Sequence, residues 1–432
     1  MTFLMTQPRG LLLEQMEAPD APSTSGRFRA VDLFLFLTVV SLNTFTLMTD
    51  IKGLSLVTQV MTVLLVLVWL LVEVIGKGAG IILPVELLLL GVLYMWSFTA
   101  MPNLMYTELF WIQMMASAKT LAGAVILVNV IRSRASLVTF FAAFGVAIVV
   151  IAALSVVTGQ FEELDKEQLI DESRVHLETD FGTHGVTATQ CQITIIGMAA
   201  AMFLTRRKLV RMLALVPAGV ALWLLANIGS RSGFVGLLLI PVLFYWVHLR
   251  RSARGRFIAK IGAITLGGLL IVGAVVAISL SRGAERLTAM SEGDVMDEAR
   301  GRNVAIAREM FLKYPMSGVG VQQFMVQSPA FGGQFMASHN TWIDALTFNG
   351  FPGACLYVAA WFLLWRRILR ARNYGLSDKD MLLMSFVLIM YWLLMFRQTV
   401  VSMWLDKFLL FPMAAVIGYT RAVETAYRPR WQ

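Results

Sequence analysis

Three arginines and one histidine stand next to long apolar segments, where an ionisable side chain needs a specific reason to be present. Arg231 lies in the Ser-Arg-Ser sequence at 230–232 between two apolar runs, Arg397 ends another apolar run, and Arg302 lies in a long polar loop expected on the same outer face. An ionisable group at membrane depth is a functional hypothesis by default. Guanidinium groups match phosphate oxygens in pairs. These arginines, together with His339, therefore indicate a diphosphate-binding site.

Two of these residues also have simpler explanations. Arg231 can be an interfacial arginine whose side chain reaches back to water, although a single tight turn at 228–233 separates the two apolar runs. His339 alone can be an ordinary surface histidine. Its position favours function, because it precedes an expected helix at Thr341 and helix N-termini attract anions.

The polar segment from Gly301 to Gly353 is where we expect the site to form. Gly318 and Gly320 allow the backbone to approach a ligand closely. His339 and Asn340 come just before Thr341-Trp-Ile-Asp344, which predicts a capping box. Residues 303–313 predict a short amphipathic helix at the membrane surface, ended by Pro315.

The composition is that of a membrane protein. The 432 residues are 58% hydrophobic and 15% charged, and apolar runs of about 17–25 residues match the roughly 30 Å hydrocarbon core. The runs do not alternate as barrel strands would. We expect an all-α polytopic fold with about twelve spanning helices. The predicted spans are 30–48, 56–75, 79–100, 109–131, 136–157, 186–204, 210–228, 232–248, 257–280, 341–364, 381–397 and 403–419.

Lysine and arginine placement sets the expected orientation. The short basic loops all fall on one side when the N-terminus is cytoplasmic, so the net charge of +9 is a sorting signal and nucleic acid is not an expected partner. We expect a disordered cytoplasmic tail at 1–29, a membrane domain at 30–420 and a second cytoplasmic tail at 421–432. Both termini are then cytoplasmic.

Two outward loops are too long to be simple turns. The loop at 158–185 is acidic around Arg174, and the loop at 281–340, between the ninth and tenth predicted helices, leads to His339. Arg174 is a further candidate for contact with a diphosphate.

Three other features have ordinary explanations. Asp378-Lys-Asp380 is read as a helix cap rather than a metal-binding pair, and no metal site is expected. Cys191 and Cys355 lie in apolar runs, where helix packing is more common than a disulfide. Lys119 lies inside a span and is expected to face the bundle interior or a water pocket.

Several short motifs together resemble the O-antigen ligase and polysaccharide polymerase superfamily (WaaL/Wzy type) of bacterial inner membranes. The resemblance covers the spanning pattern from about 30 to 420. Its motifs are Ser230-Arg231-Ser-Gly233, Gly301-Arg302, Tyr314-Pro315, Gly318-Val-Gly320, Phe324, His339-Asn340 and Gly350-Phe-Pro-Gly353. One departure is that Glu178 precedes Phe181-Gly-Thr-His184, where the family has an arginine closer by than Arg174.

The resemblance implies a fold like that of C-type glycosyltransferases, with a periplasmic active site. The implied reaction needs no metal or cofactor and moves a sugar chain from undecaprenyl diphosphate to an acceptor hydroxyl. His339 would be the catalytic base, since its reference pKa of about 6.5 suits proton transfer. Arg231 and Arg302 would stabilise the leaving diphosphate, and Ser230, Asn340, Gly318 and Gly320 would support them.

Several functions remain open: two transferases that differ in their acceptor, and two classes of protein that are not transferases. A polymerase of an exopolysaccharide or O-antigen repeat is preferred to a ligase that acts on lipid A core. Implied partners are the lipid-linked oligosaccharide, membrane lipids, and a chain-length regulator and flippase of the same pathway. A lipid-glycan flippase is the rival class, but it would place its charges near the bilayer midplane. A scaffold without activity would not need Arg231.

Overall fold

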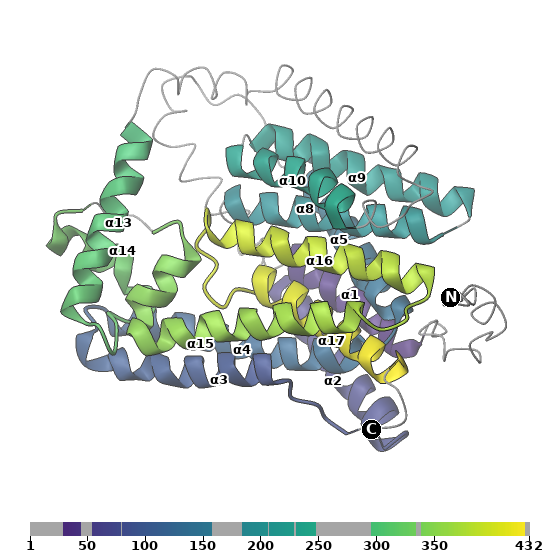
Figure 1. The fold of residues 1–432 in the computed structure, drawn as a ribbon, viewed down its shortest axis with the longest axis horizontal. Coiled ribbons are helices and arrows are strands. Elements are labelled where there is room, and N and C mark those ends of the chain that lie inside the picture. Colours follow the sequence, from purple (N-terminus) through teal and green to yellow (C-terminus); the bar gives the residue numbers. More distant parts are fainter. Residues whose placement is uncertain are drawn as a thin grey trace, which may run out of the picture.

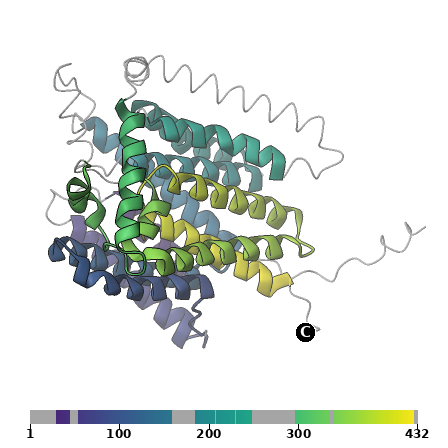
Figure 2. The same ribbon diagram turned by 60° about the vertical axis from the view of Figure 1, so that its left-hand side comes forward.

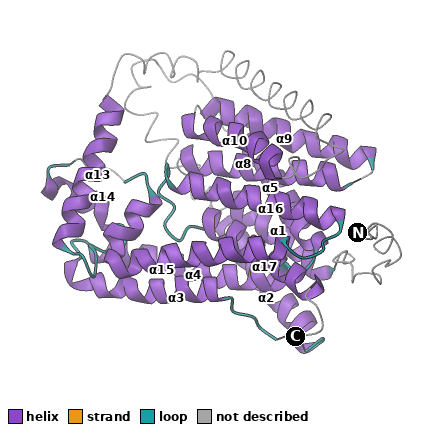
Figure 3. Cartoon of the chain, in the orientation of Figure 1, coloured by secondary structure: helices purple, strands orange, loops and turns teal. Residues whose placement is uncertain are grey.

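The computed structural model shows an all-helical chain (Figure 3). It describes residues 29–44, 54–78, 80–157, 184–205, 207–228, 230–247, 295–333 and 338–427, and for 54–56, 184–185, 228, 231 and 295–300 it describes the backbone alone. No β-strand occurs in these ranges. The predicted all-α class therefore holds for the part of the chain that is described.

The described residues up to 157 form five α-helices, two of which are extended by distorted turns. The π-helix η2 extends α2, and the 3-10 helix η3, which contains Pro102, extends α3. Helices form here because a backbone in lipid must satisfy its own hydrogen bonds. In order, the elements are α1 (Ala30–Thr44), α2 (Leu54–Trp69), η2 (Leu70–Ile75), α3 (Val85–Trp96), η3 (Ser97–Asn103), α4 (Thr107–Val130) and α5 (Arg134–Val157).

The rest of the described chain forms long helices and, between two of them, two short helical elements. These elements are α8 (His184–Leu204), α9 (Lys208–Ile228), α10 (Arg231–Val247), α13 (Val295–Lys313), α14 (Gln323–Gln327), η6 (Ser328–Phe331), α15 (Thr341–Arg372), α16 (Asp378–Gln398) and α17 (Lys407–Tyr427). The helix expected over 303–313 is confirmed; it begins earlier, at Val295, and ends just before Pro315.

Eight helices among the described residues are long and apolar enough to cross a membrane, and α1 and the stretch Ser232–Val247 of α10 are shorter apolar helices. The expected count of about twelve is not established, and the span predicted over 257–280 lies outside the described residues. Large apolar side chains such as Met95, Ile112 and Leu213 are exposed on α3, α4 and α9. Such a surface suits contact with lipid, as in an integral membrane protein.

Helix α16 runs through the middle of the bundle. Figures 1 and 2 show α8, α9 and α10 on one side of it and α3, α4 and α15 on the other. Its side chains Met384, Ile389 and Leu393 are completely buried. Helix α13 stands crosswise to the bundle, beside the start of α15.

Helix α15 contains a kink that receives a loop. Gly350 has φ 64°, inside an otherwise helical run, and Phe351 N donates to Pro315 O at 2.8 Å. A Cβ at Gly350 would lie 2.5 Å from Met316 O. Because this conformation and this close approach both require glycine, Gly350 fixes where the chain after α13 meets the bundle.

Three smaller expectations have different outcomes. Cys191 and Cys355 are free cysteines, as expected. Lys119 lies on the exposed surface of α4, so the prediction that it faces the interior is wrong. Helix α17 continues to Tyr427, into the segment expected as a C-terminal tail.

Candidate functional site

The candidate site lies where several helix ends meet. Arg397 stands in the last turn of α16, and α8, α10 and α15 all begin at the same end of the bundle. Arg397, the first turn of α10 and the residues just before α15 therefore lie at a common end of the molecule (Figure 1).

Arg397 is the centre of the polar contacts at this end. Its side chain is completely buried. Arg397 Nε donates to Thr189 Oγ1 on α8 at 2.9 Å, and Arg397 Nη1 donates to Ser232 Oγ on α10 at 2.9 Å. One guanidinium thus connects three helices. Hydroxyl oxygens are uncharged acceptors, so these two hydrogen bonds do not neutralise its charge.

The Ser-Arg-Ser link forms the first turn of α10. Ser230 Oγ accepts from Gly233 N at 3.1 Å and lies 3.3 Å from Ser232 Oγ. This is the N-cap geometry that serine favours. Arg231 is the first helical residue, and its side chain lies outside the described part of the structure. Arg397 therefore contacts the residue next to Arg231 in the chain.

Helix α8 carries a row of buried polar side chains that the sequence analysis missed. Gln192 Nε2 donates to Gly233 O at 2.6 Å, and Gln190 Nε2 lies 3.4 Å from Asn43 Oδ1. Within the described residues, the Oε1 atoms of Gln190 and Gln192 are buried and have no hydrogen-bond partner. Polar residues every one or two positions inside an apolar run, from Thr187 to Thr194, were the available signal.

His339 is exposed and has a left-handed backbone, with φ 56°. Such a conformation is uncommon for a non-glycine residue and must be held by its surroundings. The neighbouring Asn340 supplies part of that restraint, because its Oδ1 accepts from Trp342 N at 2.9 Å and from Ile343 N at 3.1 Å. Its Nδ2 donates to Thr399 O at 3.2 Å.

The predicted capping box at Thr341–Asp344 is wrong. Asn340 is the N-cap of α15. Thr341 Oγ1 donates to Val401 O at 2.7 Å, and Asp344 accepts hydrogen bonds from Ser338 Oγ, at 2.5 Å, and from Ser402 Oγ. These tertiary contacts hold the residues before α15 against those that follow α16. His339 is therefore fixed near the chain that continues from Arg397.

Gly318 and Gly320 approach another part of the backbone. Gly318 has φ 72°, and a Cβ there would lie 2.4 Å from the Phe348 carbonyl. Val319 N donates to Thr347 O at 2.8 Å, and Gly320 N donates to Phe348 O at 3.1 Å. These contacts dock the 314–320 loop on α15, which gives the two glycines a structural role.

The remaining arginines are less closely placed. Arg302 is exposed on α13, whose helix packs beside α15. Arg174 lies outside the described residues. The structure thus brings Arg397, Ser230 and the backbone of Arg231 together, and it ties Asn340 to the residues that follow Arg397.

The Asp378-Lys-Asp380 motif lies in the first turn of α16, but the cap residue is Ser377, so the prediction that the motif itself caps the helix is wrong. The buried Asp380 carboxylate accepts from Arg134 Nη2 at 2.8 Å, Tyr419 Oη at 2.9 Å and Tyr427 Oη at 2.6 Å. These partners occupy both of its oxygens. In the described ranges, no three His, Cys, Asp or Glu side chains are placed to hold a metal ion.

Comparison with known proteins relates part of the chain to a family. No curated protein matches the chain. A family model described as O-antigen ligase matches residues 213–358, from α9 to the first half of α15. The matched segment includes the Ser-Arg-Ser link, Gly318, Gly320, His339 and Asn340, while Arg397 lies beyond it. This match supports the resemblance of the chain to the O-antigen ligase and polysaccharide polymerase superfamily.

Proposed function

We propose that the protein is a membrane glycosyltransferase that moves a glycan from a polyprenyl diphosphate carrier to an acceptor sugar hydroxyl. The observation that carries this proposal is the contact of Arg397 with Ser232, beside Arg231, at the end of the bundle where α15 begins. A diphosphate leaving group needs fixed cationic donors, and an acceptor hydroxyl needs a base.

The proposed reaction is a displacement at the anomeric carbon of the donor sugar. The acceptor oxygen forms a bond to that carbon, and the electron pair of the carbon–oxygen bond to the carrier leaves with the diphosphate. His339 takes the proton of the acceptor hydroxyl. Arg231 and Arg302 bind the diphosphate oxygens, with Arg174 as a further candidate. No metal takes part.

Arg397 receives a different role from the one expected from sequence. Its side chain has no exposed surface, so a diphosphate does not reach it directly in this conformation. We assign it to positioning, because its hydrogen bonds to Thr189 and Ser232 fix the first turn of α10. Its charge acts on the same turn over a short distance in a medium of low dielectric constant.

The proposed location is the bacterial inner membrane, with both termini cytoplasmic and His339 on the periplasmic face. The basic loops between spans support this orientation. A cysteine placed at the exposed Ala330 would then be labelled from the periplasm, and one placed at Ser252 would not.

Polymerase and ligase perform the same chemistry on different acceptors. A polymerase of repeat units is our first candidate. The ligase is the second, and the description of the matching family model favours it. Deletion separates them: single repeats remaining on lipid indicate a polymerase, and full-length chains left on the carrier indicate a ligase. Loss of periplasmic repeats altogether indicates a flippase.

The test is transfer in vitro from purified undecaprenyl-diphosphate glycan, with a chelator present throughout. Arg231→Lys keeps the charge and loses the planar fork, so we expect activity to collapse at normal membrane insertion. An interfacial arginine predicts the opposite, since lysine reaches water equally well. Near-normal turnover of Arg231→Lys contradicts the diphosphate site, and loss of wild-type activity in chelator contradicts the metal-independent mechanism.

A further inference from the structure

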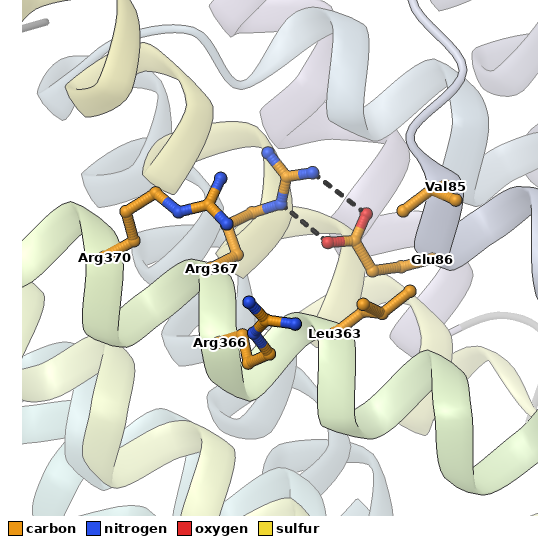
Figure 4. Close-up of a pocket in the computed structure, with 6 residues that line it drawn as sticks. All are labelled: Val85, Glu86, Leu363, Arg366, Arg367 and Arg370. Carbon is orange, nitrogen blue, oxygen red and sulfur yellow. Dashed lines mark hydrogen bonds and ion pairs between the residues drawn. The ribbon is translucent and has the colours of Figure 1, made fainter.

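A second cationic site lies at the opposite end of the bundle. A cavity of about 130 Å³ opens between the start of α3 and the second half of α15 (Figure 4). Its lining consists of Val85, Glu86, Leu363, Arg366, Arg367 and Arg370. His339 lies at the other end of α15, so this cavity does not belong to the site described above.

One of the three arginines is already neutralised. Arg367 Nε donates to Glu86 Oε1 at 2.7 Å, Arg367 Nη2 donates to Glu86 Oε2 at 3.2 Å, and Arg367 Nη1 donates to Glu424 Oε2 at 2.9 Å. This pairing joins α3, α15 and α17. Figure 4 shows the Arg367–Glu86 pair among the residues that line the cavity.

The other two arginines remain available to a ligand. Arg366 and Arg370 are exposed and four residues apart on α15, a spacing at which like charges repel on a helix surface. Within the described residues, neither side chain has a hydrogen bond or a salt bridge. An anion held between Arg366 and Arg370 would relieve the repulsion.

The border of the cavity is apolar and exposed. The Arg366 guanidinium lies 6.0 Å from the centre of the Phe362 ring, and Phe362 is 55% exposed. Val85 lines the cavity, and Leu88, one turn further along α3, is 48% exposed. A small inorganic anion has no apolar part that could contact this border. A ligand with an anionic head and apolar chains fits both parts.

We propose that this cavity binds the headgroup phosphate of an anionic phospholipid, with its acyl chains along Phe362 and Val85. Arg366 and Arg370 donate to the phosphate oxygens, an arrangement for which the guanidinium fork is suited. Basic pockets between helices at a membrane surface recognise lipid headgroups in this way. The lipid would strengthen the contact between α3 and α15.

The test uses the full-length protein purified in detergent. Bound lipid is measured by native mass spectrometry, and the thermal unfolding midpoint is measured with added phosphatidylglycerol, phosphatidylcholine or inorganic phosphate. We expect phosphatidylglycerol to bind and to raise the midpoint more than phosphatidylcholine does. In Arg366→Gln/Arg370→Gln, the apparent affinity for phosphatidylglycerol should fall by about tenfold or more, because charge-assisted hydrogen bonds are lost.

The matched control is Lys208→Gln/Arg211→Gln, which removes the same charge from exposed positions at the start of α9. This variant should keep the wild-type preference. An equal loss in the control would reduce the effect to surface charge and overturn the proposal. The proposal also fails if wild-type protein shows no preference for phosphatidylglycerol, or if inorganic phosphate alone gives the full stabilisation.

Discussion

The two ends of the helix bundle hold their arginines in different ways. At the end where α16 begins, Arg134 contacts Asp380, and Arg367 contacts Glu86 and Glu424. At the end where α16 finishes, the described hydrogen bonds of Arg397 go to two hydroxyl groups. Carboxylate partners neutralise an arginine and lock helices together. Hydroxyl partners position the guanidinium through hydrogen bonds to neutral groups.

The largest expected effect tests the carboxylate end. In Arg134→Met, the buried Asp380 loses its cationic partner. We expect the free energy of unfolding to fall by about 3–5 kcal/mol, because a buried charge without compensation is strongly destabilising. Denaturant titration of the purified protein measures this. Arg134→Met/Asp380→Asn should recover much of the loss, whereas no recovery would show that Asp380 does more than balance Arg134.

A smaller effect on stability is expected at the hydroxyl end. Arg397→Lys keeps the charge but cannot hold Thr189 and Ser232 together, so stability should fall by about 1–3 kcal/mol. Transfer activity should fall further than stability explains, since the turn that carries Arg231 loses its support. The control is Arg134→Lys, the same substitution in the α5 residue that contacts Asp380 at the other end of α16. Equal losses of transfer activity in the two variants would contradict the claim that Arg397 supports transfer more than Arg134 does.

The smallest effect is expected on α13. Arg302 is exposed on this helix, so its lysine variant can reposition its charge. Arg302→Lys should lower transfer by less than about tenfold, and Arg308→Lys, an exposed neighbour on the same helix, should leave transfer unchanged. Rates measured at equal expression check both. A loss of transfer in Arg302→Lys as large as that expected for Arg231→Lys would show that Arg302 also needs its guanidinium group.

Much of the fold follows from the length and polarity of segments. Apolar runs predicted the positions of α4, α5 and α9 closely, because a helix in lipid must be long and continuous. The helix before Pro315 was also predicted, since proline ends helices. The sequence could not show how the helices pair, so the ion pairs of Asp380 and Glu86 were not foreseen.

The candidate site was predicted less completely than the fold. His339, Ser230 and Arg397 stand out because polar residues are rare near apolar runs. The capping box predicted at Thr341–Asp344 does not form, because Asp344 accepts hydrogen bonds from Ser338 and from Ser402, which is distant in sequence. The same limit applies to Gly318, whose partner is the backbone of Phe348. Contacts between remote segments decided these roles.

The central claim is that His339 serves as the base of a transfer from a diphosphate-linked glycan. The most direct measurement compares wild-type protein and His339→Ala in the purified transfer assay, at equal protein level and with donor binding measured separately. We predict that His339→Ala binds donor normally and that its rate of transfer falls by about 10²–10⁴-fold, the usual contribution of a general base. A rate within a few-fold of wild type would contradict the account and leave His339 as a structural residue at the start of α15.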